Sequence, residues 1–109
     1  MAKFVYRLQN ILNLKQMLED QEKAQFAAAA AKEAEERDKL TKLLVRNADY
    51  QRRLQEAVSS DKIDRKEIIF FFFFYTIMKS LIRDQMFAVK RAQNALELER
   101  QKLDEARKE

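Results

Sequence analysis

The sequence predicts an all-α protein that folds as an antiparallel two-helix coiled-coil hairpin. Its 109 residues include no Gly and no Pro, the two residues that most readily interrupt a helix. Charged residues make up 37% of the chain, which is too many for a globular core but suits helices that are apolar along one stripe. A polar break at residues 59–64 separates two long apolar repeats. We therefore expect a single domain over 1–109, with helices at 3–58 and 65–109 joined by a turn at 59–64.

A seven-residue repeat runs through the second half of the first predicted helix, and seven of its ten positions are apolar. These positions are Phe26, Ala29, Glu33, Glu36, Leu40, Leu43, Asn47, Tyr50, Leu54 and Ala57. Opposite charges also occur four residues apart, as at Glu19 and Lys23, which is typical of solvated helical ion pairs. The pattern favours one continuous helix, about 80 Å long for about 55 residues.

The break itself contains turn and helix-start signals. Ser59, Ser60 and Asp61 are three short polar residues in a row, and Asp64 is followed three places later by Glu67, as in a capping box. A second repeat follows, with nine of eleven positions apolar. Its members are Phe71, Tyr75, Met78, Ile82, Gln85, Val89, Ala92, Leu96, Glu99, Leu103 and Ala106. Because neither helix can bury its stripe alone, we expect the two to pack side by side.

Folding at this turn makes paired residue numbers add up to about 123, because both helices rise equally per residue. Glu109 then lies opposite Leu14, and the first helix extends about 13 residues further, roughly 20 Å. The apolar residues of this extension have no cover from the chain itself. They are Phe4, Leu8, Ile11 and Leu12. We expect a partner, or a continuation of the second helix, to cover them.

The run Phe70–Phe74 turns through more than a full circle of a helix, so its side chains cannot all face one seam. With Phe71 and Tyr75 in the seam, a second apolar stripe is expected on another face. It comprises Phe70, Phe73, Phe74, Ile77 and Leu81. We favour a partner site, since exposed aromatic patches are typical of binding surfaces. The alternatives are an altered segment and local packing over the turn, against Val58, Ile63 and Ile68.

The composition excludes several functions. His and Cys are both absent, which removes the commonest zinc ligands and the usual general base, so we expect no enzyme, no cofactor and no metal site. The net charge of +4 is spread evenly, with 11 basic and 9 acidic residues in each of 1–58 and 59–109, so we expect no nucleic-acid partner. The apolar block Ile68–Met78 is shorter than the about 20 residues that a transmembrane helix needs, and no export signal is evident.

Three stretches carry a family resemblance. The opening MAKFVYRLQNILNLKQMLEDQEK and the later MKSLIRDQ, with KLLVRNADYQRRL before the polar turn, resemble FliJ proteins of Gram-positive flagellated bacteria. Members of that family generally run some tens of residues further and have a more mixed sequence in place of the Phe block, so we expect a truncated or altered form.

The resemblance implies a non-enzymatic component of the flagellar type III export apparatus, cytoplasmic and peripheral to the membrane at the flagellar base. By analogy with the rotor subunit of rotary ATPases, it would join the export ATPase FliI to the export gate FlhA and escort export chaperones. The ATPase-binding residues implied are Phe4, Tyr6, Arg7, Leu8, Ile11 and Leu12. The gate-binding residues implied are Leu43, Arg46, Tyr50, Phe74, Met78 and Leu81.

Two other hypotheses stay open on the residues alone. A purely structural coiled coil would self-associate into a helical bundle through the Phe block and the N-terminal extension. The candidate residues are Phe70, Phe73, Phe74 and Ile77. Peripheral binding to anionic lipid is the third, because basic residues outnumber acidic ones by three over residues 42–66.

Overall fold

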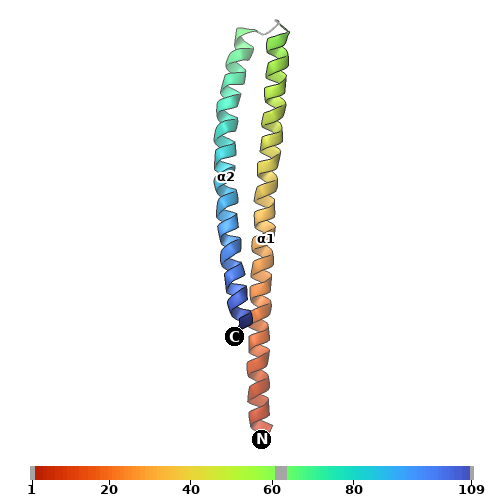
Figure 1. The fold of residues 1–109 in the computed structure, drawn as a ribbon, viewed down its shortest axis with the longest axis vertical. Helices are drawn as coiled ribbons and strands as arrows, with labels where there is room; N and C mark the ends of the chain where they lie inside the picture. Colours follow the sequence, from red (N-terminus) through yellow and green to blue (C-terminus); the bar gives the residue numbers. More distant parts are fainter. Residues whose placement is uncertain (1, 61–63, 109) are drawn as a thin grey trace. The chain divides into compact units, whose positions relative to one another are not determined.

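A computed structural model describes residues 2–60 and 64–108, which form two long helices (Figure 1). Helix α1 spans Ala2–Ser59 and helix α2 spans Arg65–Lys108. No strand occurs within these described ranges, and the all-α two-helix fold class is confirmed. Helix α1 is one residue longer at each end than the predicted 3–58. Residues 61–63 of the predicted turn lie outside the described residues.

Hydrogen bonds finish both helices on either side of the turn. At the end of α1, the Ser60 amide donates to the Glu56 carbonyl at 3.1 Å, and the Ser60 hydroxyl donates to the Ala57 carbonyl at 2.8 Å. These bonds satisfy carbonyls that a helix end leaves free. The first bond of α2 runs from the Ile68 amide to the Asp64 carbonyl at 3.1 Å, so Asp64 is the N-cap residue.

The chain divides into two compact units. The terminal unit contains residues 2–33 and 92–108, and the turn unit contains residues 34–91. Within each unit, a segment of α1 packs beside a segment of α2 that runs in the opposite direction (Figure 1). Each unit therefore has its own portion of an antiparallel seam.

The terminal unit has a narrow seam. Ala92 and Leu103 are buried, and Phe26 and Leu96 are half-buried. Every side chain from residue 2 to 18 is exposed, and the first partly covered residue of α1 is Glu19. The beginning of α1 is therefore helical without any packing from α2.

The turn unit holds the best-packed side chain of the described residues. Met78 is only 2% exposed, and Val89 is also buried. From α1, Leu40, Leu43 and Leu54 are half-buried on the facing side. The side chain of Met78 is unbranched and flexible, so it can fill an irregular gap between the two helices.

The aromatic run corrects one part of the predicted seam. Phe74, expected on an exposed stripe, is half-buried and stacks on Tyr50, with ring centroids 3.5 Å apart and an interplanar angle of 19°. Tyr75, expected in the seam, is 48% exposed. A buried tyrosine needs a partner for its hydroxyl and a phenylalanine does not, so the stack with Tyr50 favours Phe74 at this position.

Surface ion pairs follow the helical spacing that the sequence indicates. Lys23 lies 3.2 Å from Glu19, and Lys42 lies 3.0 Å from Asp38. Arg100 makes two hydrogen bonds to Glu97, from Nε at 3.0 Å and from Nη2 at 2.6 Å. This hydrogen bonding holds the pKa of the Glu97 carboxyl below its ordinary value.

The Arg100→Gln variant is therefore expected to raise the pKa of Glu97 towards its ordinary value. The guanidinium favours the charged carboxylate, and a neutral amide provides less of that stabilisation. A carbon-detected NMR titration of the Glu97 side chain measures this pKa directly. Arg91→Gln, which removes an exposed arginine of the same helix six residues before Glu97, serves as the control and is expected to leave the Glu97 pKa unchanged.

Candidate functional site

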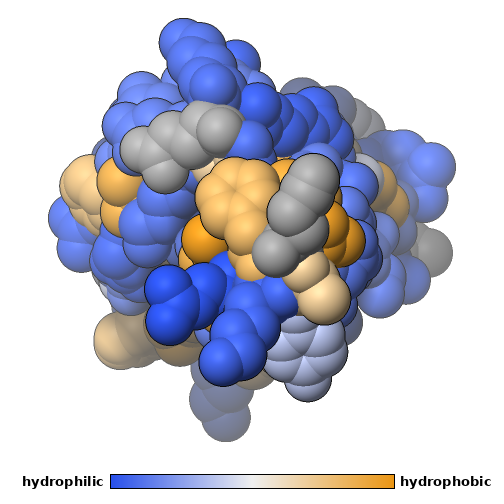
Figure 2. Space-filling view, turned by 90° about the horizontal axis from the view of Figure 1, so that it is seen from below, coloured by the Kyte–Doolittle hydropathy of each residue, from blue (hydrophilic) through white to orange (hydrophobic). Residues whose placement is uncertain are grey.

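The exposed start of α1 forms an apolar surface that we call the N-terminal stripe, defined by Phe4, Tyr6, Leu8, Ile11 and Leu12. Phe4 and Tyr6 are each 71% exposed, and Ile11 is 63% exposed. Residues 2–18 contain three basic residues and no acidic one. Figure 2, which views the end where α1 begins, shows hydrophobic side chains there with hydrophilic ones beside them. This surface is suited to a partner that is apolar and acidic.

The N-terminal stripe continues the face that α1 uses for packing elsewhere in the terminal unit. At about 100° per residue, Phe4, Leu8 and Ile11 point in the same direction as Glu22 and Phe26 to within about 60°, whereas Tyr6 lies on the opposite side of the helix. Glu22 and Phe26 are half-buried by α2, whereas the stripe is uncovered. A helix docking on this surface would thus extend the geometry of the existing seam.

The structure separates the predicted distal site into two groups. Met78 is buried, and Leu43, Tyr50 and Phe74 are half-buried in the seam of the turn unit. Arg46 and Leu81 are exposed, Leu81 at 45%. The first four side chains therefore shape and support the surface, and only Arg46 and Leu81 are presented to a partner.

Four apolar side chains on one face of α2 are exposed, and we call them the aromatic stripe. They are Phe70 at 62%, Phe73 at 63%, Ile77 at 55% and Leu81 at 45%. Val58 and Ile68 do not cover the aromatic stripe by packing over the turn, because they are themselves 55% and 50% exposed. Ile63, the remaining residue of that alternative, lies outside the described residues.

Arg46 lies on the same side of the turn unit as the aromatic stripe. Gln51 of α1 and Lys79 of α2 line one shallow hollow, which identifies one side of the seam. At about 100° per residue, Arg46 is about 140° from Gln51 around α1, and Leu81 is about 160° from Lys79 around α2. Arg46 and Leu81 therefore share the opposite side, where a cation borders an apolar surface.

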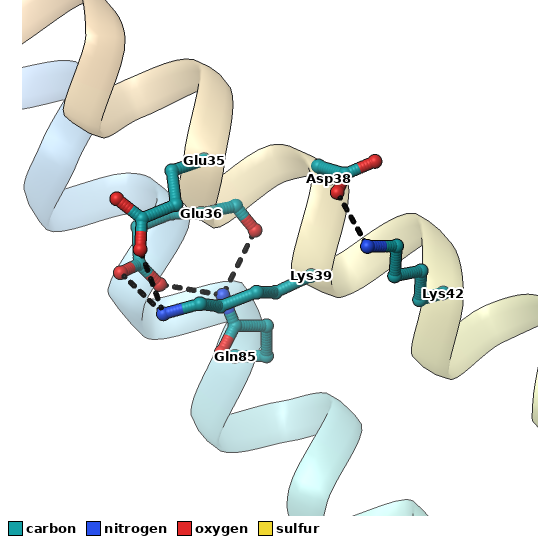
Figure 3. Close-up of polar contacts among 6 residues, drawn as sticks. All are labelled: Glu35, Glu36, Asp38, Lys39, Lys42 and Gln85. Atoms are coloured by element: carbon teal, nitrogen blue, oxygen red, sulfur yellow. Dashed lines mark hydrogen bonds and ion pairs between the residues drawn. The ribbon is translucent and has the colours of Figure 1, made fainter.

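Within the turn unit, Gln85 of α2 and Glu36 of α1 make a polar contact through the seam (Figure 3). The Gln85 amide nitrogen donates to the Glu36 carbonyl at 2.8 Å and to Glu36 Oε2 at 2.6 Å. Glu36 is 7% exposed, and Lys39 lies 3.6 Å from its other carboxylate oxygen. Sequence reasoning placed Glu36 and Gln85 on the seam and missed their hydrogen bonds. Their polarity at facing seam positions was the signal.

The described residues offer little to a small ligand. A hollow beside the Tyr50 and Phe74 rings has a volume of about 20 Å³, which is about the size of one water molecule. A larger hollow of about 520 Å³ is lined by α2 residues alone, between Thr76 and Met86, and is open to solvent. Residues 2–60 and 64–108 contain no group of three or more acidic side chains that could hold a metal ion. Over the same ranges, neither helix has a stretch apolar and long enough to span a bilayer. The exposed apolar surfaces are thus the features to explain.

The geometry agrees with what family comparison finds. The family described as flagellar FliJ protein matches residues 4–109, essentially the whole chain. The chain belongs to the FliJ family. It is therefore a protein related to flagellar export. Members of the family are non-enzymatic components of the flagellar export apparatus. No curated protein and no solved structure matches the chain.

Proposed function

We propose that this FliJ family member links the export ATPase FliI to the export gate FlhA and escorts export chaperones. The observation that carries the proposal is the presence of two exposed apolar surfaces, one in each unit of a protein related to flagellar export. Binding energy at protein interfaces is concentrated in exposed aromatic and Arg side chains, and both surfaces contain them.

The N-terminal stripe is the proposed ATPase-binding surface, together with Arg7. Its support is the high exposure of the apolar residues and the absence of any acidic residue from 2 to 18. An acidic rim around an apolar groove on the ATPase would complement it.

The aromatic stripe and Arg46 form the proposed gate-binding surface. Leu81 and Arg46 were implied by the family resemblance, and the exposure of Phe73 and Ile77 adds to their apolar area. Leu43, Tyr50, Phe74 and Met78 are proposed to act indirectly, because their packing sets the position of α2.

A binding titration with the purified ATPase and the gate's cytoplasmic domain tests this proposal. The Phe4→Ser/Leu8→Ser variant is expected to bind the ATPase at least about tenfold more weakly and the gate normally, because it loses apolar area at one surface only. The Phe73→Ser/Leu81→Ser variant is expected to show the reverse. Since all four side chains are exposed, the helix content should not change.

The matched control is Phe87→Ser/Leu98→Ser, which removes two side chains of similar exposure, 59% and 52%, outside both surfaces. It is expected to bind both partners like the parent protein. Failure of the parent chain to bind either partner would overturn the proposed function, and equal losses in all three variants would overturn the assignment of the surfaces.

Self-association into a bundle is the competing function. Of its four candidate residues, Phe74 is engaged with Tyr50 inside the turn unit, whereas Phe70, Phe73 and Ile77 are exposed. Light scattering on dilute protein distinguishes the two: a monomer at micromolar concentration would favour the linking function.

A further inference from the structure

We propose that the first turns of α2, residues 68–77, bind directly to an anionic lipid surface. Seven of these ten side chains are large, apolar or aromatic, and about half exposed or more. They are Ile68 at 50%, Ile69 at 53%, Phe70 at 62%, Phe72 at 69%, Phe73 at 63%, Tyr75 at 48% and Ile77 at 55%.

These seven side chains cover more than half of the helix circumference, which is wider than one face. At about 100° per residue, they follow one another around an arc of roughly 220°, from Tyr75 to Phe70. Phe71 and Phe74, the half-buried members of the run, occupy the remaining side towards α1. A groove on a folded protein covers one side of a helix, whereas the boundary between lipid headgroups and acyl chains can surround an inserted segment.

The charge around this segment complements an anionic surface. The net charge is even between residues 1–58 and 59–109 but uneven between the two units: residues 34–91 contain 13 basic and 9 acidic residues, and the rest of the chain contains 9 of each, so the turn unit carries the whole +4. No charged residue interrupts the stretch from Ile68 to Met78. Arg65 and Lys66 precede it, and Lys79 and Arg83 follow it. Basic side chains on both sides of an apolar segment favour anionic headgroups.

The same charges disfavour a second copy of this chain as the occupant. Two turn units meeting through residues 68–77 would bring their excess positive charges together, and like charges across an interface are destabilising. Tyr75, with an apolar ring and a polar hydroxyl, suits the depth at which lipid headgroups meet acyl chains. An anionic lipid surface therefore matches both the exposed apolar side chains and the positive charges around them.

Lipid binding is separable from the proposed gate contact. Measured from Phe73, the nearest residue of the aromatic stripe, Ile69 lies about 40° and Phe72 about 100° away around the helix, so Ile69 borders the stripe and Phe72 lies outside it. They are 53% and 69% exposed and take no part in the seam. A variant at these two positions thus tests the lipid surface without touching Leu81 or Arg46.

Vesicle flotation with the full chain tests the proposal, because protein aggregates do not float with vesicles. The chain is expected to rise with vesicles of phosphatidylcholine mixed with phosphatidylglycerol, to do so less at high salt, and to remain behind with phosphatidylcholine alone. The Ile69→Ser/Phe72→Ser variant is expected to bind at least about tenfold more weakly, since each lost side chain removes apolar burial. Arg65→Gln/Lys66→Gln is expected to weaken binding at low salt.

The control is Met86→Ser/Phe87→Ser, which changes side chains of 57% and 59% exposure on the same helix. It should float like the parent chain, and circular dichroism should show equal helix content in all variants. Absence of flotation with the anionic vesicles at low salt would overturn the proposal. So would equal binding to neutral vesicles, or flotation of the Ile69→Ser/Phe72→Ser variant at the parent's level.

Discussion

Replacing Met78 with alanine is expected to lower the free energy of unfolding by about 3 kcal/mol. Met78 is 2% exposed, the lowest value among the described residues, in a hairpin whose other buried apolar side chains are Val89, Ala92 and Leu103. Truncation to alanine removes the buried thioether and leaves a gap that two facing helices close only in part. Urea unfolding followed by circular dichroism measures the change.

Ile77→Ala is the matched control for this prediction. Ile77 is adjacent in sequence but 55% exposed, and alanine is the better helix former, so its stability should stay within about 0.5 kcal/mol of the parent or rise slightly. If the two variants lost equal stability, the seam of the turn unit would not be organised around Met78.

Much of the seam could be predicted from the apolar repeat alone. All ten positions predicted in α1 are half-buried or buried, from Phe26 to Ala57. In α2, ten of the eleven predicted positions are likewise covered. This agreement has a physical basis: Gly and Pro do not interrupt residues that favour helices, and burial of the repeat then determines which faces meet.

The exception, Tyr75, indicates where a repeat loses its predictive value. Phe74 and Tyr75 lie three and four residues after Phe71, and both spacings occur in a seven-residue repeat. Because both side chains are large and aromatic, the repeat alone does not say which of the two lies in the seam. The deciding contact is the ring of Tyr50 on the opposite helix, which stacks with Phe74. Sequence reasoning on one helix lacks that information, because the pairing depends on the register of the other.

The candidate surfaces were predictable to a similar degree. The uncovered apolar residues at the start of α1 follow from the unequal lengths of the two helices, and the structure leaves all of residues 2–18 exposed. The distal set was mixed: three of its six residues, Leu43, Tyr50 and Met78, also belonged to the predicted repeat, and all three are buried or half-buried, as is Phe74. Membership of the repeat was therefore the better guide to exposure than the family resemblance.

The Gln85→Ala variant is expected to lose about 2 kcal/mol of stability, the second-largest effect after Met78. Gln85 Nε2 donates both to Glu36 Oε2 at 2.6 Å and to the Glu36 carbonyl at 2.8 Å. Removing this donor takes a hydrogen bond from the Glu36 carboxylate, and Glu36 is only 7% exposed. A buried charge that loses a hydrogen bond without regaining water destabilises the folded state. Lys39 offsets this loss only in part, because its amine is 3.6 Å away on a side chain that is 50% exposed.

Gln93→Ala controls for the loss of an amide side chain from α2, since Gln93 is exposed and its replacement should change stability by less than about 0.5 kcal/mol. In a Glu36→Ala background, Gln85→Ala is expected to cost about 1 kcal/mol less than in the parent, because the carboxylate it served is gone. The backbone bond to residue 36 accounts for the remaining loss. Additive losses in this double-mutant cycle would show that the two side chains act independently, and the hydrogen bond between them would then contribute nothing to stability.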